Sequence, residues 1–134
     1  MKVCLIEPPK FVSLTNFVST ISMPPIGLAY IAAAIREGGH DVSVVDGPGS
    51  APRRYNMFKD KVRVRGLTQN EIVERISSDV QVIGLGCMFT SHWIYVRELI
   101  CQIREVFPKA FLLMGGERGQ KVLGIRAGYQ TIQS

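Results

Sequence analysis

The chain has 134 residues, of which 46% are hydrophobic, and its formal net charge is +5 at pH 7. A chain of this length forms one domain and buries roughly two-thirds of its unfolded surface, so the composition argues against disorder. No apolar run approaches the ~20 residues that cross a bilayer. Because Met1-Lys2 leads straight into a predicted strand, we expect no signal peptide and no membrane association.

The three cysteines, Cys4, Cys87 and Cys101, are an odd and widely spaced set. Such a set fits a reducing cytoplasm better than a disulfide framework, so we expect a cytoplasmic protein. The sequence contains neither CxxC nor CxxxCxxC. We therefore expect no iron–sulfur cluster that is held by the cysteines of this chain.

The basic residues concentrate in two segments, residues 53–65 and 118–126. A basic surface is typical of proteins that bind nucleic acid or phosphate. We do not interpret Tyr55 and Phe58, the aromatic residues among them, as a stacking platform, and neither a helix-turn-helix nor a zinc pattern occurs. We therefore expect no nucleic-acid partner.

The first half of the chain predicts a strand, a helix and a second strand. Residues 2–7 contain a continuous apolar run, which is typical of a strand buried on both faces of a parallel sheet. Residues 8–23 have no clear period and predict a loop. Residues 25–37 predict a helix, because Pro25 suits a first helical turn and Gly-Gly after the helix permits a left-handed exit. Residues 41–46 predict the next strand. The helix is expected to press closely against the sheet through Ile26, Leu28, Ala29, Ile31, Ala32 and Ile35.

The second half of the chain continues the alternation. Segment 47–66 is rich in proline, glycine and arginine and predicts a surface connection. Thr68 is a good N-cap for a helix over residues 69–78, and Glu71 completes a capping box. The remaining predicted elements are a strand over 80–86, a loop over 87–91, a helix over 92–107 with Ile94, Val96, Leu99, Ile100, Ile103 and Val106 as its apolar set, and a strand over 110–114.

This order predicts an α/β fold with a doubly wound parallel sheet and helices on both faces. Ligands of such sheets bind beyond the carboxyl ends of the strands, near the switch in strand order. Three segments converge on those ends: Pro8-Pro9, residues 86–91 and residues 115–117. The tail over 118–134 differs, because its glycines interrupt any helix and it predicts at most a weak fifth strand.

The loop after the third strand has two interpretations. Met88 and Phe89 are large apolar groups, and Thr90 or Ser91 can cap the following helix while offering a hydroxyl to a ligand. These residues indicate either the wall of a flat cofactor pocket or an ordinary N-cap with a hydrophobic staple.

The loop after the fourth strand also has two interpretations. Gly115-Gly116 either lets the backbone come close to a ligand or forms a tight turn. Glu117 either accepts a hydrogen bond from a ligand that bears amides or is simply solvated.

The histidines and Cys87 have ordinary structural interpretations. His40 precedes the second strand, at the opposite end of the sheet, and is expected to be structural. His92 is at the ligand end, where a lone histidine in a first helical turn is more often hydrogen-bonded or solvent-facing than a metal ligand. Cys87 is expected to be a small loop hydrophobe rather than a reactive thiol.

An ordered series of motifs covers residues 1–117: a strand followed by Pro-Pro, then Pro-Pro-Ile-Gly-Leu-Ala-Tyr-Ile-Ala-Ala, Gly-Gly-His-Asp-Val, Val-Ile-Gly-Leu-Gly and Leu-Leu-Met-Gly-Gly-Glu. The series resembles the cobalamin-binding domain that precedes the barrel of B12-dependent radical SAM enzymes, which include methyltransferases. The resemblance implies a flavodoxin-like fold that holds the corrin ring over the carboxyl ends of the strands. The residues that it places at the cofactor are Pro9, Gly86, Met88, Phe89, Thr90, Ser91, Gly115, Gly116 and Glu117.

The chain departs from its relatives at two places. Many B12 proteins carry DxHxxG after the first strand, with a histidine that coordinates cobalt, whereas this chain has Glu7-Pro8-Pro9-Lys10 there. The resemblance therefore implies cobalamin bound with its dimethylbenzimidazole base displaced, and no axial histidine from this loop. The radical SAM barrel and its cysteine triad are absent, so we expect no catalysis by the chain alone. We assign residues 1–117 to the cobalamin-binding unit and 118–134 to an atypical tail.

Two other functions are weighed against this one. The chain is alternatively a non-catalytic scaffold or remnant that binds a partner chain, such as one with a radical SAM domain, and no cofactor, because an incomplete fifth strand leaves a sheet edge open to pairing. A response-regulator domain is disfavoured, because it needs an acidic cluster after the first strand and an aspartate after the third. Glu7 and Gly86-Cys87 stand at those places.

Overall fold

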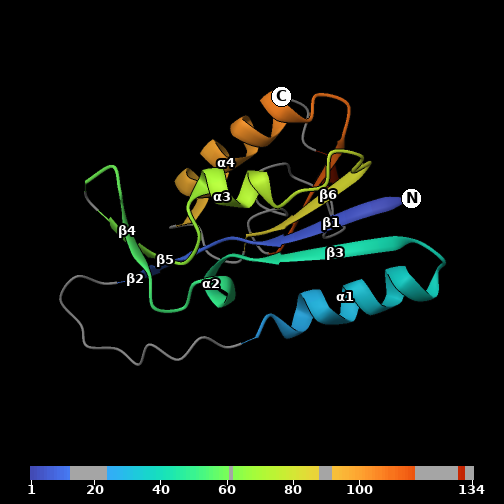
Figure 1. The fold of residues 1–134 in the computed structure, drawn as a ribbon, viewed down its shortest axis with the longest axis horizontal. Helices are drawn as coiled ribbons and strands as arrows, with labels where there is room; N and C mark the ends of the chain where they lie inside the picture. Colours follow the sequence, from blue (N-terminus) through green and yellow to red (C-terminus); the bar gives the residue numbers. More distant parts are fainter. Residues whose placement is uncertain (13–23, 61, 88–91, 117–129, 132–134) are drawn as a thin grey trace.

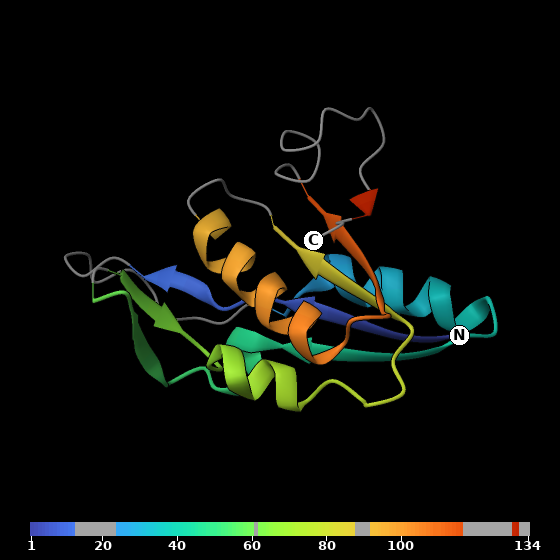
Figure 2. The ribbon, with the colours of Figure 1, turned by 90° about the horizontal axis from the view of Figure 1, so that it is seen from above.

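The computed structural model describes residues 1–12, 24–60, 62–87, 92–116 and 130–131. Figures 1 and 2 show one large sheet between helices and a smaller sheet at the end toward which the first strand runs. The elements are β1 (Lys2–Glu7), β2 (Lys10–Val12), α1 (Ile26–Glu37), β3 (Asp41–Asp46), α2 (Gly47–Ser50), β4 (Tyr55–Phe58), β5 (Val62–Arg65), α3 (Gln69–Glu74), β6 (Val82–Gly86), α4 (Trp93–Val106), β7 (Phe111–Gly115) and β8 (Gln130–Thr131).

The large sheet has the strand order β3-β1-β6-β7-β8. Its first four strands are parallel, which confirms the predicted doubly wound α/β fold. β8 lies where the weak fifth strand was expected, and it pairs antiparallel with β7 through Leu113–Thr131 and Met114–Gln130. The strand order reverses direction at β1, because the chain moves first to β3 on one side and then to β6 on the other.

The main hydrophobic core lies between this sheet and the pair α3 and α4. Side chains that alternate along the strands, such as Ile6, Ile83 and Leu112, are fully buried on this face. From the helices, Ile72 of α3 and Leu99 of α4 meet them and are fully buried too. Burial of large aliphatic side chains stabilises a fold by about 1.5–3 kcal/mol each, so this face supplies most of the hydrophobic stability.

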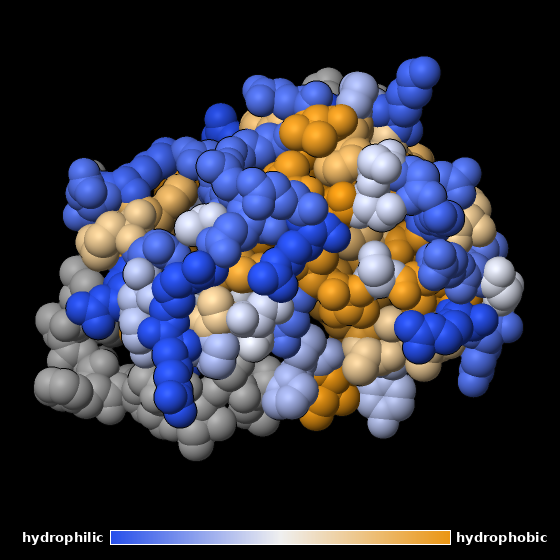
Figure 3. All heavy atoms as spheres, viewed as in Figure 1, coloured by the Kyte–Doolittle hydropathy of each residue, from blue (hydrophilic) through white to orange (hydrophobic). Residues whose placement is uncertain are grey.

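α1 covers the opposite face, but it presses against the sheet less closely than the sequence predicts (Figure 2). Of its residues only Ala32 is buried, whereas Ile26 is 58% exposed. The expectation of a closely pressed helix is therefore wrong for much of the apolar set, because α1 lies over β1 and β3 at one side of the face. Figure 3 shows hydrophobic side chains exposed along β3 and α1, beside hydrophilic ones over α2 and the small sheet.

Segment 47–66 is not the plain surface connection that its composition predicts. It forms α2, β4 and β5, and β2 joins the last two in a three-stranded antiparallel sheet of order β2-β5-β4. β2 likewise replaces part of the loop predicted over 8–23; residues 13–23 lie outside the described residues. The small sheet forms because Val64 is buried at its centre and Leu67 inserts into the main core.

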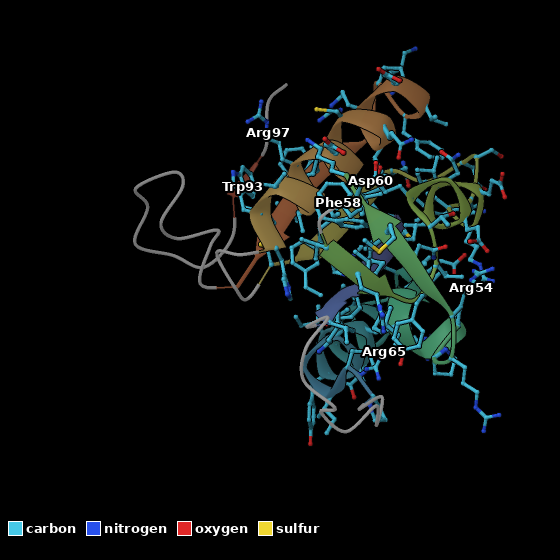
Figure 4. All side chains as sticks on the ribbon, turned by 90° about the vertical axis from the view of Figure 1, so that its left-hand side faces the viewer. Arg54, Phe58, Asp60, Arg65, Trp93 and Arg97 are labelled. Atoms are coloured by element: carbon cyan, nitrogen blue, oxygen red, sulfur yellow. The ribbon has the colours of Figure 1, made fainter. Side chains whose placement is uncertain are left out.

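The hairpin that joins β4 and β5 of the small sheet contacts α4. Lys59 and Asp60 both have positive φ at the turn, and Lys59 Nζ lies 2.7 Å from Glu98 Oε1 of α4. The ring of Phe58 packs against Tyr95 with 5.1 Å between centroids. Figure 4 looks at this end of the molecule and shows Phe58 between the small sheet and α4, with Trp93 on the opposite side of the helix.

Several boundaries differ from the predicted ones. The helix predicted over 69–78 ends at Glu74, and the strand predicted over 80–86 begins at Val82. In α4, Ile94 and Val106 are each 57% exposed although the periodicity assigned them to the apolar face, and Tyr95 is buried instead. Tyr95 is drawn inward by the aromatic rings of the small sheet, which the local period cannot anticipate.

The predicted capping box at Thr68 is confirmed. The Thr68 hydroxyl accepts a hydrogen bond from Glu71 N, and the Glu71 carboxylate accepts one from Thr68 N at 3.1 Å. Arg54 Nη2 donates to the other carboxylate oxygen at 2.6 Å. The Arg54 guanidinium, together with the Thr68 donors, lowers the pKa of Glu71 from 4.5 to about 2.

We expect Glu71→Gln to make stability less dependent on pH. Because the folded pKa of Glu71 lies below its ordinary value, the stability that it contributes is present above about pH 4.5 and is lost as the pH falls toward 2. The urea midpoints of wild type and variant should therefore differ most near neutral pH and converge in acid. Adding Arg54→Met should lower the urea midpoint more in wild type than in the Glu71→Gln background. If the midpoints of wild type and Glu71→Gln differ by the same amount at neutral and at acid pH, the lowered pKa of Glu71 is contradicted.

Candidate functional site

Three strand ends meet at the edge of the large sheet that lies near the small sheet. β1 ends at Glu7, β6 at Gly86 and β7 at Gly115, and Gly86 is paired directly with Gly115. The chain leaves β1 through α1 on one face and leaves β6 through α4 on the other. Because these connections diverge, a crevice opens between β1 and β6, at the switch in strand order where such sheets bind ligands.

A groove of about 790 Å³ starts at this crevice and runs between α1 and the sheet. Glu7, Gly86 and Gly116 line it at the carboxyl ends of the strands, and Met1 and His40 line its far end. Its volume falls in the range of about 300–1,000 Å³ that is typical of ligand pockets. The other lining residues are Val3, Leu5, Pro8, Lys10, Gly27, Leu28, Ile31, Ile35, Val82, Gly84, Leu85, Cys87, His92, Val96, Leu113 and Gly115.

Glycines at two positions near the groove allow close packing that a side chain would prevent. A Cβ on Gly84 would stand 2.9 Å from Leu5 Cδ2, so the floor of the groove has no room there for a larger residue without a shift of Leu5. Gly116 has φ +99°, and a Cβ on it would stand 2.6 Å from the carbonyl oxygen of Cys87. Two neighbouring strand ends are therefore held in close backbone contact.

Polar groups in the groove gather mainly at its mouth. The Glu7 carboxylate is half-buried, and Lys10 Nζ lies 3.8 Å from its Oε1. Burial raises the pKa of Glu7, and the nearby Asp46 carboxylate adds to that effect while Lys10 opposes it. Burial, with Lys10 as a second cause, lowers the pKa of His92. The mouth therefore presents one carboxylate, one ammonium group and an imidazole whose neutral form is favoured.

An aromatic cluster fixes His92 at this mouth. Its ring packs on Phe11 of β2 with 4.6 Å between centroids, and Phe11 also lies edge-on to Tyr95 at 6.2 Å. Tyr95 is buried, which raises the pKa of its hydroxyl. The small sheet thus contributes to the site by holding the first turn of α4 in place.

A family model for the B12 binding domain matches residues 14–121, most of the chain. The chain belongs to the B12-binding domain family. An uncharacterized methyltransferase of Pyrococcus horikoshii is 30% identical to it over 118 residues. That alignment covers 87% of this chain and 22% of the relative, so the chain spans about a fifth of the relative's length. No solved structure matches the chain significantly.

The structure of this B12-binding domain places three of the predicted cofactor residues together. Gly86, Gly115 and Gly116 all line the groove at its mouth. Pro9 is fully buried and packs against Gly47, so Pro8 lines the groove in its place. The other predicted site residues, Met88, Phe89, Thr90, Ser91 and Glu117, lie outside the described residues. α4 begins after His92, an N-cap residue whose side chain makes no capping hydrogen bond.

The α1 wall of the groove was not predicted from the sequence. Leu28, Ile31 and Ile35 line it and are only half-buried, although all were assigned to a face pressed on the sheet. The available signal was the width of the apolar face, because α1 carries more apolar residues than one flank of a sheet can cover. Lys10 was missed because it was placed in a featureless loop rather than in β2.

The remaining predictions for titratable groups concern His40, Cys87 and metals. His40 lies at the amino ends of the strands as expected, with its Nδ1 2.9 Å from the terminal amine of Met1. Cys87 is buried. Among the residues that the structure describes, no cluster of histidine, cysteine and acidic side chains could hold a metal ion. No helix in the described part of the chain is long and apolar enough to span a membrane.

We expect Gly116→Ala to destabilise the fold by about 1–3 kcal/mol, because its backbone is left-handed and the new methyl group would meet the Cys87 carbonyl. Urea denaturation measures this loss. Gly27→Ala is the matched control, since nothing lies within 4 Å of its Cβ position and alanine favours the helix by about 0.5 kcal/mol or more. Equal midpoints for the two variants would contradict the described backbone at Gly116.

Proposed function

We propose that this domain binds cobalamin in the form whose dimethylbenzimidazole base is displaced from cobalt, and that the nucleotide tail bearing this base lies in the groove under α1. One observation carries the proposal: in a chain of the B12-binding domain family, an apolar groove of about 790 Å³ opens at the strand ends where sheets of this kind bind ligands. If the base stayed coordinated to cobalt, the nucleotide tail would not extend into this groove.

The residues of the groove fit that tail. A flat aromatic base needs apolar surroundings. Leu28 and Ile31 of α1 line the groove together with Leu5 and Val82 of the sheet, and the four belong to one apolar cluster. Gly84 lies in the floor, where a larger residue would narrow the slot. A sugar and a phosphate need polar surroundings, which Lys10 supplies at the mouth. Apolar walls with a few polar groups at one end are typical of cofactor sites.

The corrin ring in this proposal lies over the carboxyl ends of β1, β6 and β7. Gly86, Gly115 and Gly116 let the ring approach the backbone, and Pro8 borders it from the end of β1. Residues 88–91 and Glu117 follow the same strand ends in the sequence, so they remain part of the proposed contact surface. We assign residues 1–117 to this cofactor-binding unit, with 118–134 outside it.

The end of β1 supplies no axial ligand in this proposal. Glu7-Pro8-Pro9-Lys10 stands where many B12 proteins have DxHxxG, and His92, at the start of α4, has its ring packed on Phe11. Bound cobalamin supplies a cobalt centre that can carry a methyl group or an electron. This chain's residues contribute the placement of that cofactor and the exclusion of water from its tail.

We place the domain in a B12-dependent radical SAM system of the methyltransferase type. The relative of Pyrococcus horikoshii is named a methyltransferase, and this chain matches only 22% of it. The sequence has no cysteine triad for a radical SAM cluster. The chemistry therefore requires a further domain or partner chain, and this chain presents the cofactor to it.

Reduced hydroxocobalamin mixed with the purified chain and then desalted should stay bound and show the base-off cob(II)alamin absorbance band. The electron paramagnetic resonance spectrum of that complex should lack superhyperfine splitting from an axial nitrogen. A nitrogen splitting would contradict the absence of an axial histidine. A colourless protein with intact helical circular dichroism would instead favour a scaffold that binds a partner chain and no cofactor.

A larger side chain in the groove should weaken binding of the nucleotide tail but leave binding of the corrin ring unchanged. We expect Leu28→Trp to weaken cobalamin binding by roughly tenfold or more, because the added ring occupies the slot. Tyr30→Trp is the matched control, since Tyr30 is on the same helix, 75% exposed and outside the groove. Titration with cobinamide, which lacks the tail, should give the same affinity for both variants. A loss of cobinamide binding in Leu28→Trp would contradict this placement of the tail.

A further inference from the structure

Glu7 is the acidic residue among the described groove-lining residues, and it lies at the switch between β1 and β6. Its side chain is 24% exposed. A half-buried carboxylate is stable only if donors or cations compensate the water that it has lost. The surroundings of its two oxygens therefore show where a ligand could supply a donor.

The two oxygens of Glu7 have different surroundings. Lys10 Nζ approaches Oε1 at 3.8 Å, which is an ion-pair distance but too long for a strong hydrogen bond. Oε2 points along the groove mouth toward Gly86, 3.4 Å from the position that a Cβ would take there. Gly86 has no side chain that could cover this oxygen.

Among the residues that the structure describes, the charges around Glu7 do not neutralise it fully. Asp46 ends the neighbouring strand β3 and is paired in register with Glu7, so a second negative charge stands beside the first. Lys10 of β2 is the cation at the mouth, and His92 of α4 is the imidazole. This local excess of negative charge attracts N–H donors and repels further carboxylates.

We propose that Glu7 accepts a hydrogen bond from a peripheral carboxamide of the corrinoid, and that it thereby selects the amidated cofactor over corrinoids that carry a carboxylate at the same position. The inference rests on the proposed function, because it needs the corrin ring over these strand ends. Cobalamin carries primary carboxamides around its ring, and each has two N–H donors and one acceptor. The corresponding acid has no donor at neutral pH and adds a negative charge.

The expected discrimination is large enough to measure. A hydrogen bond to a charged group, together with the repulsion that replaces it in the acid, corresponds to about a tenfold to hundredfold difference in affinity. Glutamine at position 7 keeps the size of the side chain but can both donate and accept. Glu7→Gln should therefore bind the amide and the acid with nearly equal affinity.

The test titrates the purified chain, under reducing conditions, with cobalamin and with its separated monocarboxylic acids. In each of these acids one peripheral carboxamide is hydrolysed. Wild type should bind one of these acids at least about tenfold more weakly than cobalamin, and Glu7→Gln should lose that difference. Asp46→Asn is the matched control: it removes a neighbouring charge, does not line the groove, and keeps a side-chain oxygen that can accept from Gly49 N. It should retain the part of the discrimination that comes from the hydrogen bond to Glu7, and lose only the part that comes from the Asp46 charge.

Each outcome decides a separate point. If wild type binds every acid as tightly as cobalamin, or if Glu7→Gln still discriminates, the role of Glu7 is wrong while the cofactor assignment stands. If Asp46→Asn loses the discrimination as fully as Glu7→Gln, the selection comes from the summed charge of the edge and not from contact with Glu7. If wild type retains no cobalamin at all, the proposed function fails and this inference fails with it.

Discussion

The position of β1 between β3 and β6 is the constraint on which the rest of the structure depends. Parallel pairing on both sides forces the chain to leave β1 across one face and to leave β6 across the other. The two connections cannot close over the same point, so the sheet opens where the order reverses. The groove, its glycine floor and the polar mouth are all built around that opening.

The two faces of the sheet are packed differently. The face under α3 and α4 is filled with large aliphatic side chains and carries the hydrophobic stability of the domain. The face under α1 has a small core of Val3, Leu5, Ala32 and Val42, with the groove beside it. Most of the groove lining lies outside the main core, which it shares only through Leu85, Cys87 and Val96, so the domain can hold an open groove of this size and still fold.

Local signals in the sequence predicted much of the fold. Thr68 and Glu71 predicted their capping box, because its partners lie three residues apart. The strand of residues 2–7 was equally clear, since a continuous apolar run requires cover on both faces. The small sheet could not be predicted in this way, because β5 pairs with β2, which is distant from it in the sequence, as in the pair Lys10–Arg65, and its register buries Arg65.

The candidate site was predicted only where backbone requirements mark it. Gly86, Gly115 and Gly116 stood out in the sequence because they stand at the ends of predicted strands, and the positive φ of Gly116 requires glycine there. Leu28 and Ile31 did not, because a residue that lines a groove and one that packs on a sheet share the same helical period. That difference depends on how far α1 extends across the sheet, which no local pattern encodes.

The residues at the two ends of β3 affect how readily copies of the protein associate at high concentration. β3 is an outer strand of the large sheet in the described part of the chain, and Val44 on it is 43% exposed. Such a strand can recruit a second copy and start aggregation. Asp41 and Asp46 stand at its two ends, so either a parallel or an antiparallel match between two copies brings carboxylates together. Repulsion between these carboxylates therefore disfavours pairing of β3 with a second copy of the chain.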